Sequence, residues 1–223
     1  MTRPDDLRAR IEADLRPVRP LLTPGQRVLL LAPAAALAWA AVPGVLGMRG
    51  DLDAIGPLLA WGGSAVQLGV AVALIAAALR EAVPGEARPQ STLFGLLAAG
   101  ALATIVLALA THAVSPEPHP RQETLASWWF CWEGAVLAAA PLLLVIVVLL
   151  ARGLPLRPGF AGALAGMGTG AAVDGGWRLY CSYSNPAHVI GSHGGAVLAL
   201  TMAGVAIAVT LGRVRQISRK EDS

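Results

Sequence analysis

Long apolar runs constrain this chain more than any other feature. Several runs of about 20 residues contain almost no charged side chain, and a helix of that length crosses the hydrocarbon core of a bilayer. Apolar residues make up 55% of the chain and charged residues only 14%, against roughly 25% charged residues in a soluble domain. Because backbone groups must pair internally in lipid, runs of this kind predict an all-α, polytopic membrane protein.

The runs predict a bundle of about six transmembrane helices. The fifth run is weaker than the others, because it is rich in glycine and alanine and contains Asp174 and Arg178. These two residues are four positions apart and can pair on one helix face. Gly162, Gly166 and Gly170 share this face and would allow a neighbouring helix to approach closely. The predicted spans are 28–48, 57–79, 91–113, 128–151, 160–180 and 188–211.

Arginine and lysine residues are unevenly distributed between the loops. Fourteen of the 17 lie in the N-terminal segment, the second and fourth loops and the C-terminal tail, which an even number of spans places on one side. Because cytoplasmic loops are enriched in these residues, we expect both termini in the cytoplasm and the chain in a bacterial inner membrane. A cleaved signal peptide is the alternative for the first run, but that run and its basic leader are longer than such signals. We expect the lipid bilayer as a partner and no direct contact with nucleic acid.

The first 26 residues form the one predicted cytoplasmic segment large enough to bind another protein. Leu7, Ile11, Leu15, Val18 and Leu22 recur at spacings of three or four, which predicts a short amphipathic helix with one apolar stripe. Two partners fit such a helix: the anionic surface of the inner leaflet, or a groove in a cytoplasmic protein. The periodicity alone does not separate them, since both require the same stripe.

Both cysteines of the chain fall at the outer surface of the membrane in this orientation. Cys131 lies near the start of the fourth span and Cys181 at the end of the fifth. A short turn at 153–155 joins these spans, so the helices are antiparallel neighbours and both sulfurs lie roughly 30 Å above the turn. Two thiols at one height can form a disulfide or share a soft metal ion. Small packing residues are the other interpretation of such cysteines.

Histidines also gather on this face. His112, His119, His188 and His193 all lie on it or near it, and any of them could supply a ligand beside the thiols. The sequence around His112 and His119 lacks the spacing of a metal site.

The sequence argues against catalysis and transport. A thiol-exchange enzyme would need a paired dithiol, and the chain has no C-x-x-C motif. A transporter would need a polar route at mid-depth, and the span centres offer little beyond Ser64, Gln67 and Thr104. We therefore expect neither enzymatic activity nor an obligatory cofactor. A small membrane thiol-redox enzyme or a transporter that uses the outer cysteines and histidines is the alternative.

Several segments together resemble a known family. Residues 152–195 contain an Arg-Gly-Leu-Pro turn, a span rich in glycine and alanine, and then Cys181, Pro186 and His193. Upstream lie the tryptophan-flanked Cys131 and, at 14–20, the segment Asp-Leu-Arg-Pro-Val-Arg-Pro. In these motifs the chain resembles the NrsF-type membrane anti-sigma factors, the negative regulators of a sigma F-like extracytoplasmic-function (ECF) sigma factor.

The resemblance implies a non-enzymatic regulator with a sigma-binding segment at 1–26 and a transmembrane sensor domain at 27–223. By this resemblance the segment sequesters an ECF sigma factor in the cytoplasm, and periplasm-facing cysteines release it in response to an oxidant or a heavy metal. The family's two cysteines correspond to Cys131 and Cys181, which are the predicted sensor thiols and the ligands of a thiol-bound heavy metal ion. His193 corresponds to the downstream histidine of the family, with His188 as a further accessory ligand. The predicted sigma-binding residues are Leu7, Ile11, Leu15, Arg16, Val18 and Leu22.

One departure concerns the residues after the second cysteine. Cys181 is followed by Ser-Tyr-Ser-Asn before Pro186, where the family often has a proline directly after the cysteine. The local ligand set therefore stays open at the level of sequence.

Overall fold

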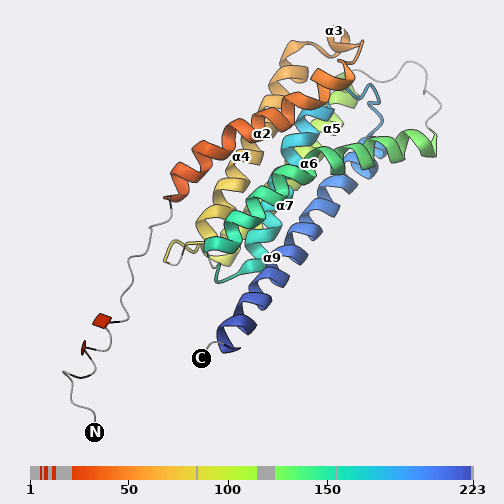
Figure 1. Cartoon of the computed structure of the whole chain (residues 1–223). Coiled ribbons are helices and arrows are strands. Elements are labelled where there is room, and N and C mark those ends of the chain that lie inside the picture. Colours follow the sequence, from red (N-terminus) through yellow and green to blue (C-terminus); the bar gives the residue numbers. More distant parts are fainter. Residues whose placement is uncertain are drawn as a thin grey trace.

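The structure is a computed structural model, which describes residues 22–83, 85–114, 124–153 and 155–221, and the single positions 6, 8, 9, 12 and 13 before them. Throughout these ranges the regular secondary structure is helical and contains no strand, which confirms the all-α part of the predicted fold class. Figure 1 shows the long helices packed side by side in one bundle. Leu22 is half exposed just before the first helix of the bundle. The rest of the predicted sigma-binding set lies outside the described residues: Leu7, Ile11, Leu15, Arg16 and Val18.

Five helices of the described chain are long and apolar enough to cross a membrane. They agree with the first, second, third, fourth and sixth predicted spans to within about one helical turn at each end. The short helix α3 (Leu52–Ile55) precedes the second of them. The five are α2 (Pro24–Leu46), η1 (Leu58–Gly62) continuing into α4 (Gly63–Glu81), α5 (Gln90–Val114), α6 (Leu125–Gly153), and α8 (Pro186–His188) continuing through η2 (Val189–Gly194) into α9 (Gly195–Glu221).

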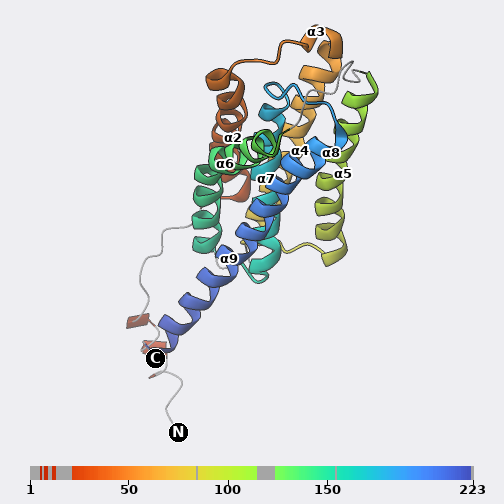
Figure 2. The same cartoon turned by 90° about the vertical axis from the view of Figure 1, so that its right-hand side faces the viewer.

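The fifth predicted span forms the central helix of the bundle, α7 (Pro158–Trp177). This helix is not among the five that are apolar enough to cross a membrane by composition. It packs against α2, α4, α5, α6 and α9, and nearly all of its residues are buried. Figure 2 shows α7 between these neighbours. Because its faces contact protein, glycine and alanine replace the large apolar residues that lipid would favour. The helix ends at Trp177, within one turn of the predicted end at residue 180, and Arg178 lies in the following turn.

Glycines allow α7 to lie close to two other helices. A Cβ atom at Gly162 or Gly166 would overlap the backbone of α9, and one at Gly170 would touch Val197 on the same helix. The predicted small-residue face is therefore confirmed as the contact between α7 and α9. A Cβ atom at Gly176 would overlap the backbone of α2. The central helix is thus packed against both the first and the last long helix of the bundle.

The two ends of the bundle carry different features. The start of α2, the α4–α5 and α6–α7 turns and the end of α9 lie at one end, and α3 lies at the other (Figures 1 and 2). At the first end the buried carboxylate of Glu81 lies 2.7 Å from the guanidinium of Arg157. The same carboxylate accepts a hydrogen bond from the backbone of Arg88 at 2.8 Å, which ties the two turns together. The opposite end, near α3, holds both cysteines.

Candidate functional site

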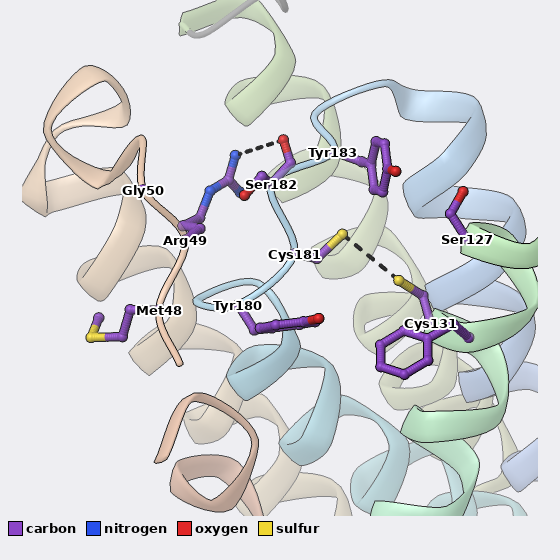
Figure 3. Close-up of a pocket in the computed structure, with 10 residues that line it drawn as sticks. Met48, Arg49, Gly50, Ser127, Cys131, Tyr180, Cys181, Ser182 and Tyr183 are labelled. Carbon is purple, nitrogen blue, oxygen red and sulfur yellow. Dashed lines mark hydrogen bonds between the residues drawn. The ribbon is translucent and has the colours of Figure 1, made fainter. Parts of the chain in front are cut away.

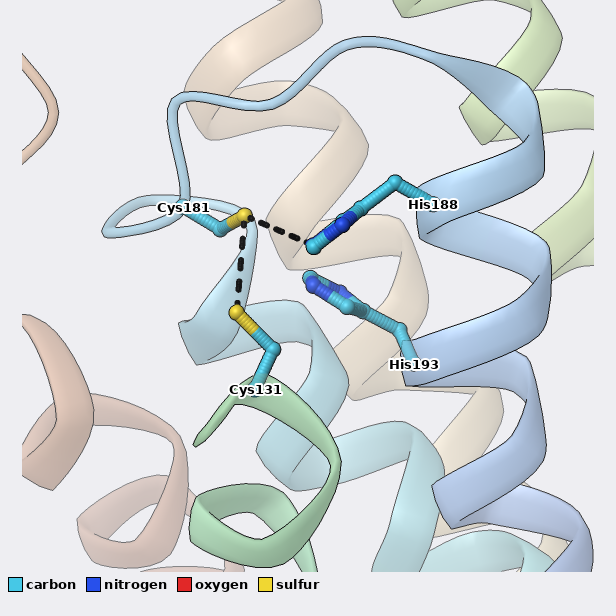
Figure 4. A group of neighbouring side chains, drawn as sticks. All are labelled: Cys131, Cys181, His188 and His193. Atoms are coloured by element: carbon cyan, nitrogen blue, oxygen red, sulfur yellow. Dashed lines mark hydrogen bonds between the residues drawn. The ribbon is translucent and has the colours of Figure 1, made fainter. Parts of the chain in front are cut away.

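Both cysteines and two histidines meet in one buried cluster. The Sγ atom of Cys131, on α6, lies 4.0 Å from the Sγ atom of Cys181, which follows α7. The Cys181 sulfur lies 3.8 Å from Nε2 of His188. With His193 these residues form the Cys/His cluster, in which one potential ligand atom from each residue lies within 4.8 Å of the others (Figure 4). The prediction that both thiols reach the same height is confirmed, and His188 and His193 lie beside them.

A local irregularity in the last membrane helix brings His188 and His193 together. The two are five positions apart, and in an α-helix this spacing turns the side chains by about 140° from each other. Val189–Gly194 instead forms a π-helical turn, whose i to i+5 hydrogen bonds widen the turn and reduce the rotation between residues five apart. The ring centroids therefore lie 5.6 Å from each other. Of the other two histidines, His112 is exposed on α5 and His119 lies outside the described residues.

Asp174 of the central helix orients His193. Its Oδ1 lies 3.0 Å from Nδ1 of His193, and its Oδ2 accepts a hydrogen bond from the amide of Gln67 on α4. The Nδ1–H of the ring donates to this carboxylate, and the Nε2 atom is buried without a hydrogen-bond partner among the described residues. The spacing in the sequence pairs Asp174 with Arg178, but the guanidinium of Arg178 hydrogen-bonds to Thr111 on α5 instead. Sequence analysis missed the role of Asp174, because its partners come from two distant helices.

Aromatic rings enclose the histidines of the cluster. The ring centroid of His188 lies 5.4 Å from that of Trp128 and 4.5 Å from that of Tyr183. The ring of His193 lies 6.5 Å from that of Trp177. Tryptophan is common at membrane interfaces, and here Trp128 and Trp177 form a wall around the histidines. This wall limits the access of water to the imidazoles.

The sulfurs have a route to the surface. An open pocket of about 410 Å³ is lined by both cysteines together with Arg49, Ser127 and Tyr180 (Figure 3). The contact with the Cys131 sulfur, and then burial, raise the pKa of the Cys181 thiol well above its usual value. Because the pocket reaches both sulfurs, a small oxidant or a metal ion can approach them from the surface, while the histidines lie behind them.

Arg49 fastens the turn that carries the second cysteine to the end of α2. Its backbone N–H donates to the carbonyl oxygen of Leu179 at 2.9 Å. Its guanidinium pairs with both oxygens of Asp51, at 2.6 and 2.8 Å, and donates to Ser182 O at 3.3 Å and Ser184 Oγ at 3.1 Å. The side chain is buried, with 4% of its surface exposed. Arg49 is one of the three basic residues outside the predicted cytoplasmic segments, and the structure links it directly to the site.

The polar residues at mid-depth are engaged in helix contacts. The Ser64 hydroxyl donates to the carbonyl oxygen of Gly175 and accepts a hydrogen bond from the Trp39 indole at 2.8 Å. Gln67 contacts Asp174, as described above, and the Thr104 hydroxyl donates to the carbonyl oxygen four residues earlier on its own helix. These residues serve packing between α2, α4 and α7 or remain within α5, rather than lining an open polar route among the described residues.

Comparison with known proteins gives one match. A family described as the negative regulator of sigma F, NrsF, matches residues 12–213. The matched region contains the whole Cys/His cluster, Asp174 and Arg49. No curated protein and no solved structure matches the chain.

Proposed function

Because the chain belongs to the family of negative regulators of sigma F, we propose that it is an inner-membrane anti-sigma factor with six membrane-crossing helices. In this arrangement α7 crosses as the sixth helix, and its neighbours shield it from lipid. The end of the bundle that carries most of the basic loops faces the cytoplasm. The Cys/His cluster then faces the periplasm. The partner is a cytoplasmic ECF sigma factor, and the role is regulatory rather than enzymatic.

The N-terminal segment, residues 1–26, sequesters the sigma factor. Its apolar stripe is of the kind that docks in a groove of a folded partner. The segment continues directly into α2, which begins at Pro24 after a capping box formed by Thr23 and Gln26. Any displacement of α2 therefore changes how the segment is presented to its partner.

Cys131 and Cys181 act as the sensor, and the 4.0 Å between their sulfurs is the observation that carries this proposal. A disulfide needs the sulfurs at about 2.05 Å, so oxidation must shorten the distance between the two sulfurs by about 2 Å. A peroxide serves as the oxidant: both thiols lose their protons, the S–S bond forms, and the peroxide is reduced to two molecules of water. Capture of a thiophilic heavy metal ion by both sulfurs is the other signal.

Movement of the Cys181 turn reaches the cytoplasmic end through α2. Arg49 holds that turn at the end of α2, and Trp39 in the middle of α2 packs against Gly176 of α7. Release of the sigma factor requires a different affinity for it in the two states of the sensor. Such coupling between two sites is typically about 1–3 kcal/mol, which corresponds to a roughly 5- to 150-fold change in affinity.

Co-purification from membranes tests sigma binding. The tagged full-length chain should retain the sigma factor, identified by mass spectrometry, and the pair Leu7→Asp with Ile11→Asp should lose it while membrane insertion persists. Ala9→Asp, which lies off the stripe, is the matched control and should bind normally. Retention of the sigma factor by the Leu7 and Ile11 variant would place the binding surface elsewhere.

Replacement of the thiols tests the sensor. A variant with Cys131→Ser and Cys181→Ser should still bind the sigma factor and should no longer release it after treatment with peroxide or a thiophilic metal. Ser127→Ala, in the same pocket, should respond as the unmodified protein does. Normal release from the double serine variant would contradict the assignment of the sensor.

A further inference from the structure

Two edges of the Cys/His cluster lie close to those of a tetrahedral metal site, and all four potential ligand atoms lie within 4.8 Å of one another. With Zn–S bonds of about 2.3 Å and Zn–N bonds of about 2.0–2.1 Å, tetrahedral angles place two sulfurs about 3.8 Å apart and a sulfur and a nitrogen about 3.6 Å apart. The cluster has 4.0 Å between its sulfurs and 3.8 Å between Cys181 Sγ and His188 Nε2. A contraction of a few tenths of an ångström along these two edges brings them to the expected values.

The ligand set specifies the class of ion. Two thiolates and two imidazoles are the donors of many structural zinc sites, whereas Mg²⁺ and Ca²⁺ prefer oxygen. Two thiolates also balance the charge of a divalent cation, so the occupied site adds no net charge to a buried location. With four protein ligands there is no open coordination position, which is typical of a structural or regulatory site rather than a catalytic one.

The surroundings of His193 provide independent support. Metal-bound histidines commonly donate their second ring N–H to a carboxylate, which fixes the ring and the tautomer. Asp174 makes this contact with Nδ1 of His193 and is itself held by Gln67. The free Nε2 atom of His193 is buried and has no hydrogen-bond partner among the described residues. A cation in the cluster would satisfy this nitrogen, which is otherwise costly to bury.

From these observations we propose that the reduced protein binds one Zn²⁺ ion through Cys131, Cys181, His188 and His193, with Asp174 as a positioning residue. The site is the one assigned above as the thiol sensor, so the regulatory meaning of the ion rests on the proposed function. The binding itself does not depend on the sigma factor. Zn²⁺ is then a resident of the reduced state, and its loss accompanies the signal.

Metal binding and disulfide formation exclude each other at this cluster. Tetrahedral coordination holds the sulfurs about 3.8 Å apart, and a disulfide brings them to about 2.05 Å. On oxidation the thiolates of Cys131 and Cys181 form the S–S bond and together give two electrons to hydrogen peroxide. The hydrogen peroxide takes up two protons and is reduced to two molecules of water, and Zn²⁺ would be released. The oxidised turn then no longer shares an ion with His188 and His193 on the last helix.

Metal analysis of the full-length protein tests the site. Protein purified in detergent under reducing conditions should contain about one Zn²⁺ per chain by mass spectrometry of the metal. His188→Ala and His193→Ala should each lower this content strongly, and the exposed His112→Ala is the matched control that should retain it. Equal zinc content in all three variants would overturn the proposal.

Cobalt substitution provides a measurement that does not rely on variants. Co²⁺ added to the metal-free protein should give the intense visible bands of tetrahedral cobalt and a near-ultraviolet thiolate-to-cobalt band. Asp174→Asn should keep the thiolate band but weaken metal affinity by about 10- to 100-fold, as expected for an orienting group. A weak octahedral spectrum without the thiolate band in the unmodified protein would refute the site.

Oxidation separates this inference from the proposed function. Peroxide added to zinc-loaded protein should release one Zn²⁺, detected with a chromophoric chelator, for each disulfide formed. Formation of the disulfide with retention of zinc would overturn the exclusion of the two states. No sigma factor is present in these assays, so a failure of sigma co-purification leaves their outcome unchanged, and the reverse also holds.

Discussion

Arg49 offers the sharpest test of the proposed coupling between the Cys/His cluster and the N-terminal segment. Arg49→Gln removes the guanidinium contacts to the Cys181 turn but keeps the backbone hydrogen bond to Leu179. The lost contacts to Ser184 Oγ, Ser182 O and Arg178 O are 3.1, 3.3 and 3.4 Å long. Because they lie at the long end of the hydrogen-bond range, we assign them about 1–2 kcal/mol together.

This energy is comparable with a typical coupling between two sites, about 1–3 kcal/mol. We therefore expect Arg49→Gln to lower the ratio of sigma affinities between reduced and oxidised protein by about 5- to 30-fold, the equivalent of these 1–2 kcal/mol. Some coupling should persist, since the backbone contact and the packing of α2 on α7 are retained.

The assay measures sigma affinity for the full-length chain in lipid nanodiscs, in the reduced state and after peroxide treatment. Disulfide formation is quantified in the same samples by mass spectrometry, so that a failure to oxidise is not mistaken for a loss of coupling. Arg80→Gln is the matched control, because it removes the same charge from an exposed position in the last turn of α4. If Arg49→Gln oxidises fully and keeps the unmodified affinity ratio, the turn does not signal through Arg49.

Three further outcomes test the packing and the orientation of the bundle. Gly166→Leu forces a side chain against the backbone of α9. We expect the bundle to lose about 1–3 kcal/mol or more of stability, measured as a lower thermal midpoint in detergent. An unchanged midpoint would contradict the close approach. Glu81→Gln leaves Arg157 without its anion and should lower the free energy of unfolding by about 1–3 kcal/mol in a denaturant titration. This is below the roughly 3–5 kcal/mol of a fully buried pair, because the Arg157 side chain is 24% exposed. Full stability would show that the pair contributes little. In a background without the native cysteines, an impermeant maleimide should label Ser127→Cys from the periplasm and Arg152→Cys only after permeabilisation, and the reverse result would invert the proposed orientation.

Hydropathy located the long apolar helices well, because the length and apolar composition needed to cross lipid are properties of each segment alone. A segment that crosses lipid must itself be long and apolar. The five apolar helical spans, Pro24–Leu46, Leu58–Glu81, Gln90–Val114, Leu125–Gly153 and Pro186–Val214, therefore agree with the predicted spans to within about one turn. Residues 160–180 gave a weaker hydropathy signal for a membrane span, because hydropathy does not take contacts with neighbouring helices into account. A helix surrounded by other helices needs small side chains more than apolar ones, and α7 is that helix.

The two thiols were also within reach of the sequence. The turn at 153–155 makes α6 and α7 antiparallel neighbours, and equal lengths along the two helices place Cys131 and Cys181 at one height. Contact between the sulfurs depends in addition on the rotation of each helix about its axis. That rotation is set by packing, and here it leaves the sulfurs 4.0 Å apart.

The contributions of Asp174 and Arg49 lay outside sequence analysis. Asp174 has a nearby basic residue four positions later, and helical spacing favours that local pair. The structure gives its carboxylate to His193 and Gln67 instead. Arg49 binds a turn that lies more than half of the chain away. In both cases the packing of distant helices determines the partner, and the sequence around each residue does not indicate which helices meet.

The sequence by itself determined which segments can leave water, because transfer to lipid depends on the composition of each segment alone. It also determined the family resemblance and the presence of two thiols on neighbouring helices. The tertiary structure alone decided that His188 and His193 face the same side, through a π-helical turn, and that a carboxylate from the central helix stands behind one of them. The physical reason is that the four-residue cluster combines side chains from α6, the turn after α7 and the last helix. Packing between helices, rather than local composition, brings these side chains together.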